Sequence, residues 1–176
     1  MTSLETKRLL LRSWREGDLD AYFGMVSDPE VMRFIGDGST YDRVGAWRSM
    51  AYLLGHWQLR GFGLWAVEEK ATGRLVGRVG LNQPEGWPGL EVGWLLAREA
   101  WGLGYATEAG RASLDHAFDA LGADHVISVI RPGNEASVRV AERLGETFEG
   151  NDRIGESPVL IYGVSRQAWT EEDRGR

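Results

Sequence analysis

Three strand-like segments follow one another in the middle of the chain, with only short turns between them. The segments at 64–67, 75–81 and 90–96 are rich in apolar residues, and 71–74 has the composition of a hairpin turn. A helical spacing of apolar residues follows at 105–121. Such a meander excludes a doubly wound fold, because that fold needs a helix between successive strands. We therefore expect a mixed, mostly antiparallel sheet.

The segments around the meander are expected to complete this sheet and to cover its faces. They are predicted as a strand at 4–14, short helices after Asp18 and Asp28, a longer helix at 41–59, a strand at 125–130, a helix from Asn134 to Gly145, and strands at 147–153 and 159–165. The prediction is an α/β (α+β) fold of six to seven strands and four helices. A length of 176 residues fits a single domain over residues 1–176.

Composition and charge exclude several classes of function. The chain has no cysteine, so it has no disulfide framework, thiol nucleophile or cysteine-based zinc site, and its three histidines share no metal-ligand spacing. A net charge of −6 argues against a nucleic-acid partner, which favours a basic surface. The first residues lack the pattern of a signal peptide, and no apolar run has the length of a membrane span. We expect a cytoplasmic protein with no membrane partner and no metal.

The junction between the strand at 90–96 and the helix at 105–121 is rich in glycine. It consists of Trp101, Gly102, Leu103, Gly104, Tyr105, Ala106 and Thr107. Glycine lets the main chain approach a ligand, and the N–H groups at a helix start attract pyrophosphate. A tight turn explains the glycines equally well. A P-loop is excluded because the lysine is missing, and the dinucleotide-binding fingerprint fails because its spacing and the preceding meander do not fit.

Residues 101–106 resemble the acyl-CoA pyrophosphate loop of GNAT N-acetyltransferases, whose pattern is Gln/Arg-x-x-Gly-x-Gly/Ala. Gly104 and Ala106 match its last two fixed positions, whereas Trp101 stands where Gln or Arg is usual. This departure is typical of the RimJ/RimL-like branch of ribosomal-protein N-terminal acetyltransferases. Further segments resemble that branch at 4–12, 27–32, 134–137 and 144–145, although Glu146 replaces the usual phenylalanine. The resemblance covers roughly residues 3–168.

The resemblance implies how acetyl-CoA, the co-substrate, is held. In the GNAT fold the strands at 90–96 and 125–130 splay into a V, and pantetheine lies between them like an extra strand. It would bind main-chain groups of Trp94, Leu95 and Leu96, while residues 101–107 bind the pyrophosphate and Asn134 holds the pantetheine arm. The amine would enter from the other side, under the helices of residues 18–59.

Direct transfer of the acetyl group requires a neutral amine and a proton for the departing thiolate. An α-amine has a reference pKa of about 7.7–8.0 and a lysine of about 10.4, so an α-amine needs less help from a base. Glu91 is the candidate base, with a structural ion pair as the alternative. The tyrosine that many GNAT enzymes place seven residues after the asparagine is Ala141 here. The RimL-like pattern implies Ser137 as the acid instead, although Asn134 and Ser137 could also simply cap the helix.

The acceptor is the least constrained part of the prediction. Phe34, Trp47, Trp65 and Asn82 are candidates for its pocket, although core packing explains the aromatic residues equally well. The amine is predicted to be a peptide N-terminus, with a small-molecule amine or an aminoglycoside-type drug as the alternative. A catalytically silent acyl-CoA-binding sensor is a rival from another class. A homodimer is compatible with the sequence, which does not require one.

Overall fold

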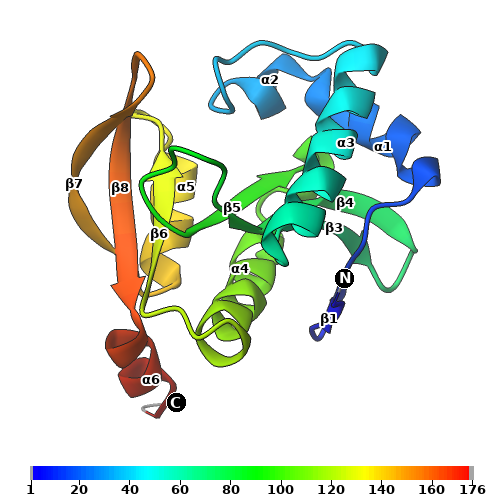
Figure 1. The fold of residues 1–176 in the computed structure, drawn as a ribbon. Coiled ribbons are helices and arrows are strands. Elements are labelled where there is room, and N and C mark those ends of the chain that lie inside the picture. Colours follow the sequence, from blue (N-terminus) through cyan, green and yellow to red (C-terminus); the bar gives the residue numbers. More distant parts are fainter. Residues whose placement is uncertain (1, 175–176) are drawn as a thin grey trace.

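The computed structural model describes residues 2–174, and its strands form one open sheet (Figure 1). The order across the sheet is β1-β2-β3-β4-β5-β6-β8-β7, and every neighbouring pair is antiparallel except β5 and β6. The strands are β1 (Leu4–Glu5), β2 (Leu9–Arg12), β3 (Leu64–Glu69), β4 (Arg74–Asn82), β5 (Glu91–Leu96), β6 (His125–Ile130), β7 (Thr147–Ile154) and β8 (Ser157–Ser165). The predicted mixed α/β fold, with its central meander, is confirmed.

The sheet has eight strands rather than six to seven, because the segment predicted as one strand at 4–14 folds back on itself. The N–H of Thr6 donates to the carbonyl of Leu9, and the N–H of Leu9 donates to the hydroxyl of Thr6. These bonds close a turn between β1 and β2, which then pair with each other.

Six α-helices lie within the described residues, whereas the fold prediction gave four helices and the segments predicted along the chain account for five. They are α1 (Leu19–Val26), α2 (Pro29–Met32), α3 (Arg43–Arg60), α4 (Tyr105–Asp115), α5 (Glu135–Arg143) and α6 (Arg166–Arg174). The last one was not predicted. It begins where the Ser165 hydroxyl accepts the N–H of Ala168, and Trp169 anchors it by donating to Asp115. None of the helices in residues 2–174 has the length and apolar composition needed to cross a membrane.

The helices pack on both faces of the sheet. Apolar side chains of α1, α2 and α3 form one core with Leu64, Ala66 and Leu95 of the sheet. On the opposite face α4 packs against β2, β4 and β5, and α5 packs against β6 and α4. In Figure 1, α1–α3 and the β7–β8 hairpin stand on opposite sides of the two central strands.

The two central strands diverge, as the predicted V requires. β5 and β6 share a single register position, Glu91 opposite Ile127, where the N–H of Ile127 donates to the carbonyl of Leu90 at 2.8 Å. Beyond this position the rest of β5 has no strand partner on its β6 side. The strands are therefore joined at the start of β5 and open toward its end.

Trp65 belongs to the core, which corrects its predicted place in the acceptor pocket. Its side chain is fully buried, its ring packs edge-on against Trp57 and His116, and its Nε1 donates to the carbonyl of Thr2 at 2.8 Å. The physical reason is the double coverage of β3, whose residues 64–67 are all buried. Trp47 is also corrected, because it is 57% exposed on α3 and does not line the cleft described below.

These two tryptophans give a matched test of the packing. Trp65→Ala should lower the free energy of unfolding by about 3–5 kcal/mol, because it leaves a large cavity in the core. Trp47→Ala should change it by about 0.5 kcal/mol or less, as exposed substitutions do. Chemical denaturation of both variants measures this difference. Equal losses would contradict the assignment of Trp65 to the core.

Candidate active site

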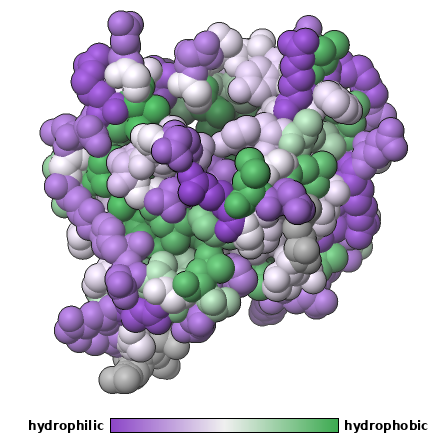
Figure 2. Space-filling model, viewed as in Figure 1, coloured by the Kyte–Doolittle hydropathy of each residue, from purple (hydrophilic) through white to green (hydrophobic). Residues whose placement is uncertain are grey.

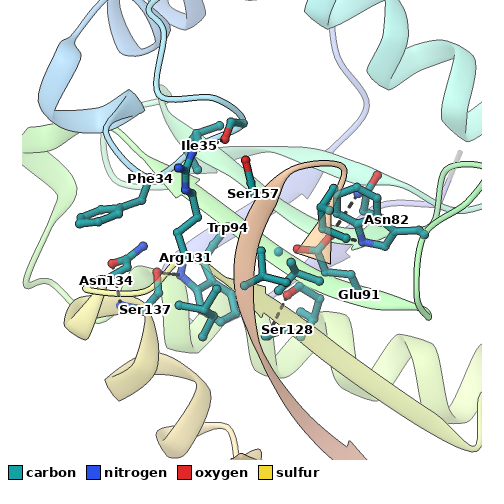
Figure 3. A pocket seen from close by; sticks show the side chains of 18 of the residues that line it. Phe34, Ile35, Asn82, Glu91, Trp94, Ser128, Arg131, Asn134, Ser137 and Ser157 are labelled. Atoms are coloured by element: carbon teal, nitrogen blue, oxygen red, sulfur yellow. Dashed lines mark hydrogen bonds between the residues drawn. The ribbon is translucent and has the colours of Figure 1, made fainter. Parts of the chain in front are cut away.

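A cleft of about 410 Å³ lies where β5 and β6 separate. Six of the predicted site residues line it: Phe34, Asn82, Glu91, Trp94, Asn134 and Ser137. Figure 3 shows Glu91 and Asn82 on one side of it, and Asn134 and Ser137 on the other. In Figure 2 the surface is hollowed between the part over β8 and the part over α3. The structure therefore brings together residues that lie as far apart in the sequence as Phe34 and Ser137.

Glu91 begins β5 and is held by two neutral donors. Asn82 lies opposite it in the β4–β5 register, and its Nδ2 donates to Glu91 Oε2 at 3.1 Å. Trp87 Nε1 donates to the same oxygen at 2.9 Å. Burial raises the pKa of Glu91 above its usual value, although both hydrogen bonds and the nearby Arg78 oppose this. A carboxylate with a raised pKa is a stronger base, as a group that accepts an amine proton must be.

Ser137 and Asn134 stand at the start of α5, across the cleft from Glu91. Asn134 Oδ1 accepts the N–H of Ser137 at 3.2 Å. Asn134 therefore caps the helix, which is the alternative role that the sequence allowed for it. Ser137 Oγ accepts Nε1 of Trp94 at 3.2 Å. The serine hydroxyl has no hydrogen-bond acceptor within the described part of the chain. Its proton can therefore be directed into the cleft.

The glycine-rich junction forms an exposed loop that leads into α4. Gly102 and Gly104 have φ angles of +75° and +80°, a conformation that favours glycine. No side chain caps α4 at Gly104, so the first N–H groups of the helix have no side-chain acceptor. The side chains of Trp101 and Leu103 are about half exposed.

Neighbouring residues fix this loop in place. Trp101 Nε1 donates to the carbonyl of Leu96 at 3.0 Å, and Arg8 Nη1 donates to that of Leu103 at 2.9 Å. Tyr105 is buried and donates its hydroxyl to Glu69, while Ala106 packs on the same core. Because the polar atoms of Trp101 and Tyr105 already have partners and Leu103 and Ala106 are apolar, the polar groups that the loop offers a ligand are mainly main-chain groups.

The side chains of Leu95 and Leu96 are buried in the cores on opposite faces of the sheet. The main-chain groups of Leu95 face β4, where Leu95 pairs with Arg78, and the carbonyl of Leu96 accepts Nε1 of Trp101. The main chain of Trp94 and the N–H of Leu96 are therefore the groups of this part of β5 that face the V.

Sequence reasoning assigned no role to Glu146, which lies beneath the vertex of the V. It is 3% exposed, and its Oε1 lies 3.0 Å from the hydroxyl of Ser128. That hydroxyl also lies 3.0 Å from the carbonyl of Val92. A hydroxyl has one proton and a carbonyl can only accept, so both bonds form when Glu146 is protonated and donates to Ser128. Burial accordingly raises the pKa of Glu146 to about 8.

Two arginines that sequence reasoning did not single out also line the cleft. Arg131 Nη1 donates to the carbonyl of Gly36 at 2.6 Å and so links the end of β6 to the loop after α2. Arg78 of β4 lines the face below α1–α3. Among the residues that the structure describes, no three His, Cys, Asp or Glu side chains gather as a metal site would require.

Comparisons with known proteins agree with this geometry. A family model described as an acetyltransferase (GNAT) domain matches residues 8–147. The chain is 34% identical over 169 residues to the uncharacterized protein YkkB of Bacillus subtilis (strain 168), covering 92% of this chain and 94% of that protein. It is 32% identical to the crystal structure of an acetyltransferase from Agrobacterium tumefaciens str. C58, with a TM-score of 0.83 over 93% of this chain and 94% of the other.

The fold is also similar to that of RimL, a ribosomal L7/L12 alpha-N-protein acetyltransferase whose structure is a complex with coenzyme A. The TM-score is 0.80 and the two chains are covered to 95% and 99%, at 18% identity. At this identity the comparison shows a shared fold only.

The protonated state of Glu146 can be tested by the pH dependence of stability. Between the ordinary pKa of 4.5 and about 8, the folded chain keeps this proton while the unfolded chain has lost it. The residue therefore lowers the free energy of unfolding by about 1.4 kcal/mol per pH unit as the pH rises through this range. Because glutamine does not titrate, the free energy of unfolding of Glu146→Gln should rise relative to that of the wild type as the pH rises, by up to about 1.4 kcal/mol per pH unit.

Chemical denaturation at several values between pH 5 and 8 measures this difference. Glu99→Gln is the control, because Glu99 is exposed in a surface ion pair with Arg74. Parallel pH profiles for the wild type and Glu146→Gln would show that Glu146 is ionised in the folded protein.

Proposed function

The chain belongs to the GNAT acetyltransferase family, and from that premise we propose that it transfers the acetyl group of acetyl-CoA directly to an α-amine at a peptide N-terminus. The observation that carries this proposal is the placement of Glu91 and Ser137 on opposite sides of one cleft. A base on the acceptor side and an acid on the donor side are the two groups that direct transfer requires.

The residues present fit acetyl-CoA. β5 has no strand partner on its β6 side beyond Glu91, so the main chain of Trp94 and the N–H of Leu96 are available to pair with pantetheine. The uncapped N–H groups at the start of α4, next to Gly102 and Gly104, suit a pyrophosphate. Asn134 and Ser137 border the space between these two regions.

The proposed reaction forms the new N–C bond as the C–S bond of the thioester breaks. Glu91 accepts the proton that the amine must lose, directly or through a water molecule. The Ser137 hydroxyl donates its proton to the departing sulfur and recovers one from solvent. A main-chain N–H of β5 near Trp94 would stabilise the oxyanion; such a donor contributes about 3 kcal/mol to lowering a barrier.

The α-amine is favoured over a lysine amine because of the base. About a tenth of α-amines are already neutral at pH 7, whereas a lysine amine is almost fully protonated. A single carboxylate with a raised pKa is therefore sufficient for an α-amine. The segment at 134–137 and the position of Ser137 in the cleft support the RimJ/RimL-like branch. A small-molecule amine stays the alternative acceptor.

Replacing the base should abolish most of the turnover without weakening the binding of acetyl-CoA. Glu91→Gln should lower kcat by about 100-fold or more, since general-base catalysis contributes about 10²–10⁴. Release of CoA thiol from acetyl-CoA, with N-terminal peptides, lysine peptides, polyamines and aminoglycosides as acceptors, measures this rate. Glu99→Gln should behave as the wild type, and acetyl-CoA should bind both variants equally. Near-normal turnover in Glu91→Gln would remove Glu91 from the mechanism.

Loss of the acid should slow the breakdown of the thioester. Ser137→Ala keeps the helix cap at Asn134, because the bond uses the main-chain N–H of residue 137. Its kcat should fall about 10-fold to 100-fold, with an unchanged Kd for acetyl-CoA. A variant that turns over at the wild-type rate would show that water, rather than Ser137, protonates the sulfur.

A further inference from the structure

Arg78 is a charged side chain in the cleft for which the fold supplies no partner. Its Nε is buried and has no hydrogen-bond partner. Among residues 2–171, whose side chains the structure describes, no carboxylate forms an ion pair with it. Arg78 is half-buried, and burying its Nε donor without a partner carries a desolvation cost, so this arginine in a cleft calls for an explanation.

Arg12 shows what a structural arginine looks like in the same sheet. It is 6% exposed, and its two Nη atoms each lie 2.8 Å from an oxygen of Asp18, while its Nε lies 2.7 Å from Glu68. The fold thus gives one buried arginine two hydrogen-bonded carboxylates and gives Arg78 none. The difference indicates that the partner of Arg78 comes from outside the chain.

The position of Arg78 points to the acceptor rather than to CoA. It lies on β4, which β5 separates from the opening of the V. It is opposite Leu95, whose side chain packs under α1–α3, so Arg78 projects from that same face. Acetyl-CoA is proposed to occupy the other side of β5, next to β6 and α5.

The surface of the sheet between Arg78 and Glu91 is open. On this face of β5, Gly93 stands between Glu91 and Leu95 and carries no side chain. A Cβ built there would lie 3.4 Å from Oε1 of Glu91 and 3.9 Å from Cδ2 of Leu64. Burial raises the pKa of Glu91 and of Tyr52, and the charge of Arg78 opposes this rise at both groups, so both lie within its electrostatic range. One ligand can therefore span from Glu91 to Arg78.

We propose that the acceptor carries a carboxylate close to its reacting α-amine, and that Arg78 binds this carboxylate while Glu91 receives the amine. The planar guanidinium matches a carboxylate in a two-point contact. The acceptor class is a peptide N-terminus with an acidic side chain at its second position. This inference rests on the proposed function, since it places the amine at Glu91.

A binding experiment tests the inference without relying on turnover. The probes are the product analogues acetyl-Ala-Asp-Ala-amide and acetyl-Ala-Asn-Ala-amide, which differ only in the charge of one side chain. Each is titrated into the CoA-saturated enzyme, and the tryptophan fluorescence of the cleft, which Trp87 and Trp94 line, reports the Kd. The aspartate probe should bind about 10-fold or more tightly, as hydrogen bonds to charged groups allow. Arg78→Gln should reduce this preference to about twofold or less.

Arg74→Gln is the matched control, because Arg74 lies on the same strand but is exposed and paired with Glu99. It should keep the full preference. A second probe pair, N-acetylalanine and N-acetylalaninamide, distinguishes the source of the carboxylate. A preference for N-acetylalanine that Arg78→Gln removes would support carboxylate binding and identify a free α-amino acid as its source.

Equal Kd values for both members of each pair in the wild type would overturn the inference, as would a preference that survives in Arg78→Gln. Neither result would affect the proposed function, which thiol release tests separately. Conversely, an enzyme that discriminates the probes through Arg78 but acetylates no amine would support the carboxylate site and contradict the proposed activity.

Discussion

The single register position that joins β5 and β6 is the constraint on which the rest of the site depends. The bond from Ile127 to the carbonyl of Leu90 holds the strands together at Glu91, and the hydroxyl of Ser128 bridges to Val92 at the vertex. Beyond this point the strands separate. The cleft therefore has Glu91 at its base and is open to both faces of the sheet. A fully paired β5 and β6 would close it and leave Ser137 without access to the reacting atoms.

The charged groups around this vertex differ in their environments, and each environment favours a different protonation state or role. Glu146 stays neutral at pH 7, so it adds no negative charge beside Glu91, and like charges this close would compete for a proton. Asn82 and Trp87 donate to Glu91 and so support its ionised form. Arg78 supplies a positive charge on the acceptor face, and Arg131 lines the cleft at the end of β6, where its Nη1 donates to the carbonyl of Gly36. The side chains of Asn134 and Ser137, by contrast, are neutral.

Local patterns predicted the elements and the loop, but not the contacts between distant residues. The meander, the glycine-rich junction and the Asn134 cap are local features, and the structure confirms them as such. The hydrogen bond between Thr6 and Leu9 divides the predicted first strand, and nothing in the apolar pattern of 4–14 signals that turn. Trp65 was misplaced because β3 is covered on both faces, so its side chains do not alternate. Glu146 acquires its role from burial, and Arg78 acquires its proposed role from its place in the cleft. For Glu146 the sequence did carry a signal, because a glutamate stands there in place of the usual phenylalanine.

A crystal structure of the complex with CoA would test the site directly. Pantetheine should run between β5 and β6, the pyrophosphate should lie on the N–H groups after Gly102, and the sulfur should be within hydrogen-bonding distance of Ser137 Oγ. The α1–α3 side of the cleft, with Glu91 and Arg78, should stay open to an acceptor. A CoA that lies across the α1–α3 face, or a sulfur directed away from Ser137, would contradict the account.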